Sequence, residues 1–264
     1  MSNAPVYFVI AQVRFNPILT LGNYLPAIQD ALRKEGFPDF QQNSIMEIKV
    51  NLGGQSDQQQ ATPSVVPKTL WMFKDSIQRS GFVLDQVSMS YQTTEYDTFE
   101  PFLSKLMNGL SIIHEHAKLD FTERLGIRYL DAILPTGDEE LSKYLSPNVL
   151  GLFGKLGHRT FMHAMSETRT QTDHTGLISR AVIYKQDVKG EVAFPADMTP
   201  QFLQVMDKFR EVAGTYGIID TDSFYTSRED FNLRKIEEHF SSLHTEIRKS
   251  FDLMVTPYAL DSWK

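Results

Sequence analysis

The sequence predicts an α+β protein in which antiparallel sheets carry helices packed on one face. Short segments that alternate apolar and polar residues are separated by turn residues, as in antiparallel strands. Two longer segments, near residues 97–113 and 230–254, repeat apolar residues every three or four positions, which is typical of amphipathic helices. The chain has 264 residues, of which 41% are hydrophobic, and this is ample material for a core.

The first elements follow from residue spacing. Alternation from Tyr7 to Phe15 predicts a strand with one apolar face. Apolar residues at helical spacing over 22–35, followed by Gly36, predict a helix that ends at this glycine. A short strand is expected over 45–50, before a glutamine-rich loop over 53–64 that we expect to be mobile.

A hairpin and a second helix are expected next. Strands over 69–78 and 82–91 flank an Arg-Ser-Gly turn. Asp97 with Glu100 three residues later resembles a capping box and predicts the start of a helix, and a strand over 124–134 follows it. The resulting β-α-β-β-β-α-β order suggests a ferredoxin-like, split β-α-β arrangement for the amino-terminal half, residues 1–135.

Residues 136–264 are expected to form a second α+β half, a hairpin plus a long helix, packed with the first half as one compact unit. An Asp-His-Thr-Gly turn predicts the hairpin of strands over 159–170 and 177–186. A helix is expected over 199–212, and Ser227 is expected to cap the last helix. The shorter elements are a helix near 139–145 and a strand over 216–220.

Composition excludes several classes of protein. The chain has no cysteine, which excludes disulfides, thiolate nucleophiles and cysteine-bound metals. Its 26 basic and 33 acidic residues give a net charge of −7 without a basic tract, which argues against nucleic acid as a partner. We found no signal sequence and no apolar run near the ~20 residues of a membrane span, so we expect a cytoplasmic protein. Peripheral lipid contact stays open.

No catalytic or cofactor motif is present. The glycines over 151–157 do not have the spacing of a phosphate or dinucleotide loop. His114 and His116 are two residues apart on a predicted helix, so they point away from each other and cannot grip one metal ion. Acidic pairs such as Asp220 and Asp222 suit turns and helix caps. We therefore expect no catalytic residue, no cofactor and no metal site.

Two groups of residues are candidates for binding an anion or a partner. Alternation places Arg124, Gly126 and Arg128 on one face of their strand, and guanidinium forks bind planar anions while glycine permits close approach. The alternative is that acidic residues of neighbouring elements pair with both arginines. A second basic patch, which could equally be a solvated hairpin face, contains His158, Arg159 and His163 among its members.

The sequence as a whole resembles a sporadically distributed family of uncharacterised bacterial proteins of about 260 residues. The resemblance rests on the Arg-Phe-Asn-Pro corner that begins at Arg14, the Arg-x-Gly-x-Arg-Tyr strand over 124–129 and the carboxy-terminal Leu-His helix around His244. It implies a family without an assigned enzyme activity and with a link to conflict systems such as phage defence. Arg14, the first residue of this corner, is also a candidate for binding an anion or a partner.

We therefore expect a non-enzymatic binding or adaptor protein with a protein partner or a homo-oligomeric state, as a sensor or partner subunit of a bacterial anti-phage or toxin–antitoxin system. One alternative is a hydrolase or nuclease whose site is assembled only in three dimensions. A cleft that brings together two or more of four residues would favour it: Asp131, His163, Asp220 and Asp222. The other alternative is a protein that binds a lipid or another apolar ligand between its sheet and its helices.

Overall fold

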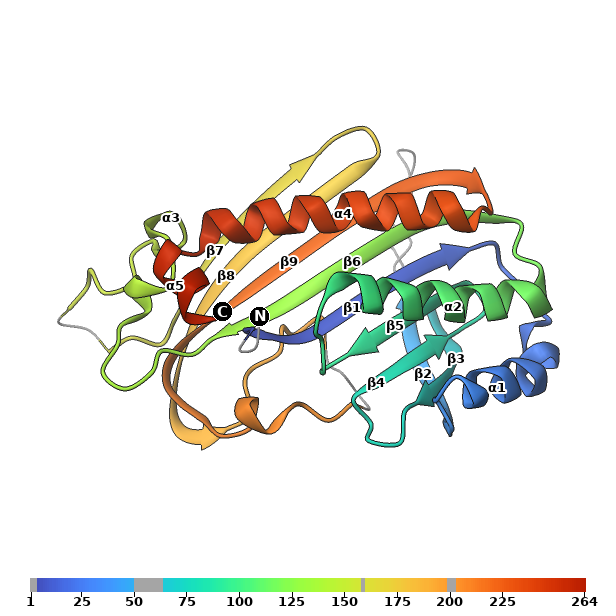
Figure 1. Cartoon of the computed structure of the whole chain (residues 1–264), viewed down its shortest axis with the longest axis horizontal. Coiled ribbons are helices and arrows are strands. Elements are labelled where there is room, and N and C mark those ends of the chain that lie inside the picture. Colours follow the sequence, from blue (N-terminus) through green and yellow to red (C-terminus); the bar gives the residue numbers. More distant parts are fainter. Residues whose placement is uncertain (1–3, 50–63, 158–159, 199–202) are drawn as a thin grey trace.

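The structure is a computed structural model that describes residues 4–49, 64–157, 160–198 and 203–264. Within these residues, nine strands form one antiparallel sheet in the order β2-β3-β4-β5-β1-β6-β9-β8-β7 (Figure 1). The strands are β1 (Val6–Phe15), β2 (Asp39–Lys49), β3 (Ser64–Lys74), β4 (Ser80–Leu84), β5 (Ser88–Thr93), β6 (Phe121–Ile133), β7 (His163–Gln171), β8 (Thr175–Gly190) and β9 (Val212–Asp230). The helices are η1 (Leu21–Tyr24), α1 (Leu25–Lys34), α2 (Phe99–Ala117), η2 (Leu141–Lys143), α3 (Pro147–Leu150), η3 (Asp207–Phe209), α4 (Leu233–Met254) and α5 (Pro257–Ser262).

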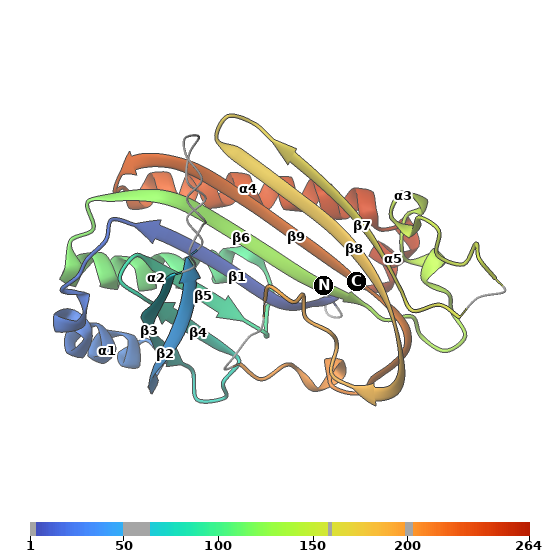
Figure 2. The same ribbon diagram turned by 180° about the vertical axis from the view of Figure 1, so that it is seen from behind.

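Helices α1, α2 and α4 pack on one face of the sheet, which Figure 1 shows from the helix side. Their apolar stripes meet the inward residues of the central strands in one core, and Phe240 of α4 and Leu106 of α2 are fully buried there. None of these three helices covers the opposite face in Figure 2. We call this opposite face, which carries Arg14, Arg124 and Arg128, the open face.

Part of the open face is nevertheless covered by the segment between β8 and β9. Val192, Val205 and Phe209 of this segment are buried against Phe8 of β1 and Leu130 of β6. We call its described residues, 191–198 and 203–211, the strap. The strap leaves the Arg14 end of β1 uncovered by its apolar side chains, so polar residues of the sheet remain available there.

The predicted α+β class, with an antiparallel sheet and helices on one face, is confirmed. The ferredoxin-like arrangement of the amino-terminal half and the hairpin-plus-helix arrangement of the other half are not confirmed. Instead, β1 lies between β5 and β6, and β6 pairs with β9 along most of its length. Strands from both parts of the chain therefore belong to the same sheet.

The strand expected over 82–91 is divided into β4 and β5. Asp85 lies between them, and its carboxylate accepts hydrogen bonds from the backbone N–H groups of Val87 and Ser88 at 2.7 and 2.8 Å. This side chain stabilises a tight turn, because an aspartate can replace strand hydrogen bonds with local ones. Most of the loop expected over 53–64 lies outside the described residues.

The helix expected over 199–212 is wrong for the residues that the structure describes. Between Leu203 and Val212 only η3 is helical, and residues 199–202 lie outside the description. Leu203 and Val205 are buried while Gln204 between them is exposed, which is the alternation of an extended chain lying on a sheet. The apolar residues of this segment have a spacing that fits one face of a helix, but the same residues can also be buried by an extended strap.

The cap predicted for the last helix is also wrong. Ser227 and Asp230 belong to β9, which is 19 residues long and much longer than the strand expected over 216–220. The helix begins at Leu233, and the side chain of Asn232 accepts a hydrogen bond from the N–H of Lys235 at 3.1 Å. Beyond α4 the chain packs against the rest of the fold, since Trp263 is buried. None of the helices in the described ranges combines the length and apolarity needed to cross a membrane.

Candidate functional site: the open face of the sheet

The side chains of strand β6 alternate between the two faces of the sheet. Leu125, Ile127 and Tyr129 belong to the core beneath the helices. Arg124 and Arg128, in between, lie on the open face with the residues paired to them on β1 and β9. The three candidate positions of this strand therefore share one face, but their surroundings differ.

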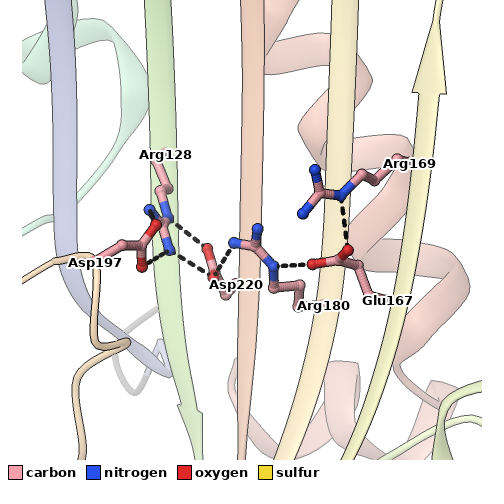
Figure 3. Close-up of polar contacts among 6 residues, drawn as sticks. All are labelled: Arg128, Glu167, Arg169, Arg180, Asp197 and Asp220. Carbon is pink, nitrogen blue, oxygen red and sulfur yellow. Dashed lines mark hydrogen bonds and ion pairs between the residues drawn. The ribbon is translucent and has the colours of Figure 1, made fainter. Parts of the chain in front are cut away.

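Arg128 is engaged with two carboxylates (Figure 3). Its Nε and Nη2 donate to the two oxygens of Asp220 on β9 at 2.6 and 2.7 Å. Its Nη1 and Nη2 donate to the two oxygens of Asp197 in the strap at 2.9 and 3.1 Å. Burial by itself lowers the pKa of Arg128, but these hydrogen bonds outweigh burial and raise it above its ordinary value.

The ion pairs continue outward across the sheet. Arg180 of β8 donates from Nη1 to Asp220 at 3.0 Å and from Nε to Glu167 on β7, and Arg169 donates to the same Glu167 at 2.7 Å (Figure 3). Hydrogen bonds from Arg169 and Arg180 lower the pKa of Glu167 to about 2. We call Arg128, Asp197, Asp220, Arg180, Glu167 and Arg169 the ion ladder.

The ion ladder makes Arg128 a structural residue. It is only 8% exposed, and its donors already face four carboxylate oxygens. The alternative reading of the two strand arginines, that acidic neighbours pair with them, therefore holds for Arg128. Arg128 ties the strap to the sheet through Asp197 and has no donor geometry left for a planar anion.

Arg124 has a different environment. Its guanidinium stacks on the ring of Phe224 at 4.9 Å, and the described residues place no carboxylate within ion-pair distance of it. Burial lowers the pKa of Arg124; nearby Asp222 opposes this effect and Arg14 adds to it. Arg14 lies directly opposite Arg124 in the β1–β6 register, and it too has no ion pair or hydrogen bond among the described residues.

Gly126 explains how Arg124 is held. A Cβ atom at Gly126 would lie 2.8 Å from Nη1 of Arg124, so the guanidinium occupies the space that any larger residue would need. The place without a side chain that the sequence predicted between two arginines is thus filled by one of them. Gly126 and Phe224 together orient Arg124 along the sheet surface.

A polar groove of about 440 Å³ adjoins this arginine pair. Gln12 and Arg14 of β1 form one side of it, and the turn after β4 forms another through Asp85 and Ser88. Lys68 on β3 also lines the groove, where its Nζ lies 2.8 Å from Oδ2 of Asp85. Among the described residues, the groove therefore offers the unpaired guanidinium group of Arg14, with Arg124 beside it on β6, together with neutral donors and one paired lysine.

The second predicted patch is not brought to this groove. His163 begins β7 at the far edge of the sheet and is exposed there. His158 and Arg159 lie outside the described residues. Of the seven predicted binding residues, Arg14, Arg124 and Gly126 meet, whereas Arg128 is engaged in the ion ladder.

The acidic residues that would have favoured a hydrolase are distributed over both faces. Asp220 is held by Arg128 and Arg180 on the open face, and Asp131 lies in the helix-covered layer. Asp222 is half-buried, and burial raises its pKa. The described residues contain no group of three or more histidine, aspartate and glutamate side chains suited to hold a metal ion.

Sequence reasoning missed the acidic half of the ion ladder. Glu167 is part of an alternating strand and Asp197 part of the strap, and neither has a local motif. The only available signal was the excess of arginine on one face of the predicted strands, which requires partners somewhere. No family model and no curated protein sequence matches the chain.

Proposed function

We propose that this chain is a binding protein whose open face docks an acidic segment of a protein partner. Arg14 and Arg124 would receive carboxylates of that segment beside the groove that contains Gln12. The single observation that supports this is the presence of two adjacent guanidinium groups that have no carboxylate partner within the described ranges, on a face where the neighbouring arginines are paired. Like charges placed opposite each other in a sheet destabilise it unless an anion compensates them.

Carboxylates of a protein segment fit this site better than a nucleic acid does. The chain carries a net charge of −7, and Asp222 and Asp85 lie next to the arginine pair, so a long phosphate backbone would meet repulsion on both sides. A short acidic peptide needs only the two guanidinium forks, which bind carboxylates bidentately. The resemblance to an uncharacterised bacterial family with a proposed link to conflict systems extends the proposal to an adaptor or sensor subunit of a defence pair.

The test measures the affinity of a fluorescent acidic peptide, rich in glutamate, and of a matched glutamine peptide. We expect the native chain to bind only the acidic peptide and to lose affinity with added salt. Arg14→Gln should weaken binding about tenfold, a change of ~1.4 kcal/mol. Arg169→Gln is the matched control, because Arg169 is an exposed open-face arginine that is already paired with Glu167.

The proposal fails if Arg14→Gln and Arg169→Gln bind the acidic peptide equally well, or if single-stranded nucleic acid binds more tightly than the peptide. In the native host, a partner that co-purifies with the unaltered chain should be lost with Arg14→Glu. Retention of that partner by the charge-reversed chain would place the interface elsewhere.

A further inference from the structure

A second cavity lies in the helix-covered layer, on the side of the sheet opposite the arginine pair. It has a volume of about 240 Å³ and lies between the start of α2, the carboxy-terminal half of α4 and the beginning of β1. Its apolar walls include Val6, Ile247 and Phe251. Pockets for drug-sized ligands span roughly 300 to 1,000 Å³, so the occupant of this cavity must be smaller.

Asp131 of β6 lines this cavity and has no partner among the described residues. The residue is 4% exposed, and the described part of the chain contributes neither a hydrogen bond nor an ion pair to its carboxyl group. A buried carboxylate without a partner is costly, because its charge has lost its hydration. Burial raises the pKa of Asp131 to about 8, with Asp220 adding to the effect and Arg248 opposing it.

The walls near Asp131 are aromatic. The hydroxyl groups of Tyr96 and Tyr129 lie 3.2 Å apart, and His244 stacks on Phe99 with ring centroids separated by 3.9 Å. Burial lowers the pKa of His244, so its ring is a neutral wall near pH 7. Aromatic faces attract cations through their negative ring surface, most strongly when the site is desolvated.

The charged groups of the cavity are mainly acidic. Asp97 and Glu100 at the start of α2 join Asp131 in the lining, and no ion pair engages Asp97 or Glu100 within the described residues. Arg248 is the single basic residue of the described lining, and its Nε already lies 3.2 Å from Oδ1 of Asp252. Among the described residues, unpaired acidic groups therefore outnumber basic ones in the lining, with Asp131 buried and Asp97 and Glu100 exposed to solvent, and this favours a positively charged occupant.

We propose that this cavity binds a small organic ammonium ion with a compact apolar body, whose nitrogen pairs with Asp131 and whose body packs against Tyr129 and His244. The observation that supports the proposal is a buried carboxyl group, without a partner in the part of the chain that the structure describes, in a cavity with aromatic walls. This ligand class goes beyond the proposed partner binding, because it concerns the other face of the sheet and different residues.

The test titrates three probes of one shape into the full chain and follows the NMR signals of His244 and Tyr129. The probes are 2-phenylethylamine, the neutral 2-phenylethanol and the anionic 3-phenylpropionate. We expect the amine to shift these signals and to bind with an affinity at least about tenfold higher than that of the alcohol, because only the amine can pair with Asp131. Stronger or equal binding of the alcohol or the acid would overturn the proposal, and so would the absence of binding by all three.

Variants add a second readout. Asp131→Asn keeps the size of the side chain and should weaken amine binding about tenfold or more. Glu115→Gln, an exposed residue on α2, is the matched control and should bind the amine as the unaltered chain does. Retained amine affinity in Asp131→Asn contradicts the proposal. If Asp131→Asn does not fold, the comparison of the three probes on the unaltered chain decides.

The two binding proposals can fail separately. Arg14→Gln lies on the open face and should leave amine binding unchanged, while Asp131→Asn should leave acidic-peptide binding unchanged. A loss of both activities in both variants would indicate a shared structural defect. That result would count against two independent sites.

Discussion

Arg128 of β6 donates two parallel hydrogen bonds, of 2.6 and 2.7 Å, to the carboxylate of Asp220 on the neighbouring strand β9. The side chain of Asp220 is 1% exposed, and that of Arg128 is 9% exposed. Burying both charges is costly, and the paired geometry offsets this cost. Because Arg128 also holds Asp197, the same side chain links β6, β9 and the strap.

Replacing Arg128 by alanine should therefore destabilise the fold. The change leaves Asp220 with Arg180 alone and frees the strap, and we expect a loss of about 3 kcal/mol in the free energy of unfolding, measured by urea denaturation. Arg169→Ala, which removes an exposed member of the ion ladder, should cost less than about 1 kcal/mol. Equal effects of the two substitutions would contradict a structural role for Arg128.

Replacing Asp131 by asparagine should stabilise the fold in a pH-dependent way. The pKa of Asp131 is raised from 3.8 to about 8 in the folded chain, so the unfolded chain loses this proton first. The stability of the unaltered chain therefore falls as pH rises between these values. The variant escapes this loss, and its advantage should grow by a few kcal/mol between about pH 4 and pH 8 and then level off.

The measurement compares urea midpoints of Asp131→Asn and the unaltered chain across this pH range. Several titratable or charged groups face Asp131 or act on it from neighbouring elements: Asp97, Glu100, Arg248, His244, Tyr96, Tyr129 and Asp220. Glu115→Gln therefore serves as the control, since its exposed side chain lies outside the cavity. An advantage of Asp131→Asn that does not change with pH would refute the prediction.

Replacing Gly126 by alanine should affect binding more than stability. The added Cβ would lie 2.8 Å from Nη1 of Arg124, the flexible end of a side chain that can move away. Stability should change by less than about 1 kcal/mol. The displaced guanidinium should weaken acidic-peptide binding roughly fivefold, about 1 kcal/mol. Unchanged peptide affinity would show that the position of Arg124 does not matter for binding.

Replacing Gly109 by alanine should lower the stability of the fold more than it affects binding. This residue lies in α2, where alanine is intrinsically favoured over glycine by about 1 kcal/mol. The added Cβ would, however, lie 2.3 Å from Cε1 of Phe82, whose ring is fully buried beneath the helix. We expect a net loss of about 1 to 3 kcal/mol from overpacking. Gly157→Ala, with no atom of the described residues within 4 Å of its Cβ, should be nearly neutral by the same denaturation measurement.

The local pattern of apolar residues was sufficient to predict the elements in which the buried residues recur at one regular spacing. Alternation over Tyr7–Phe15 corresponds to β1, and the helical stripe ending at Met254 corresponds to α4. It was insufficient for the strap, because Leu203 and Val205 suit a helix stripe and an extended chain alike. It also missed the length of β9, whose outer part pairs with strands distant in the chain.

The sequence alone is enough to place Arg124 and Arg128 on the same face of one strand, since alternation is a property of the extended backbone. Whether each arginine is paired depends on the register between strands. Asp220 is 92 residues from Arg128, and backbone hydrogen bonds between β6 and β9 bring the two together, whereas the register between β1 and β6 leaves Arg124 opposite Arg14. Pairings of this kind are long-range, so no local motif carries them.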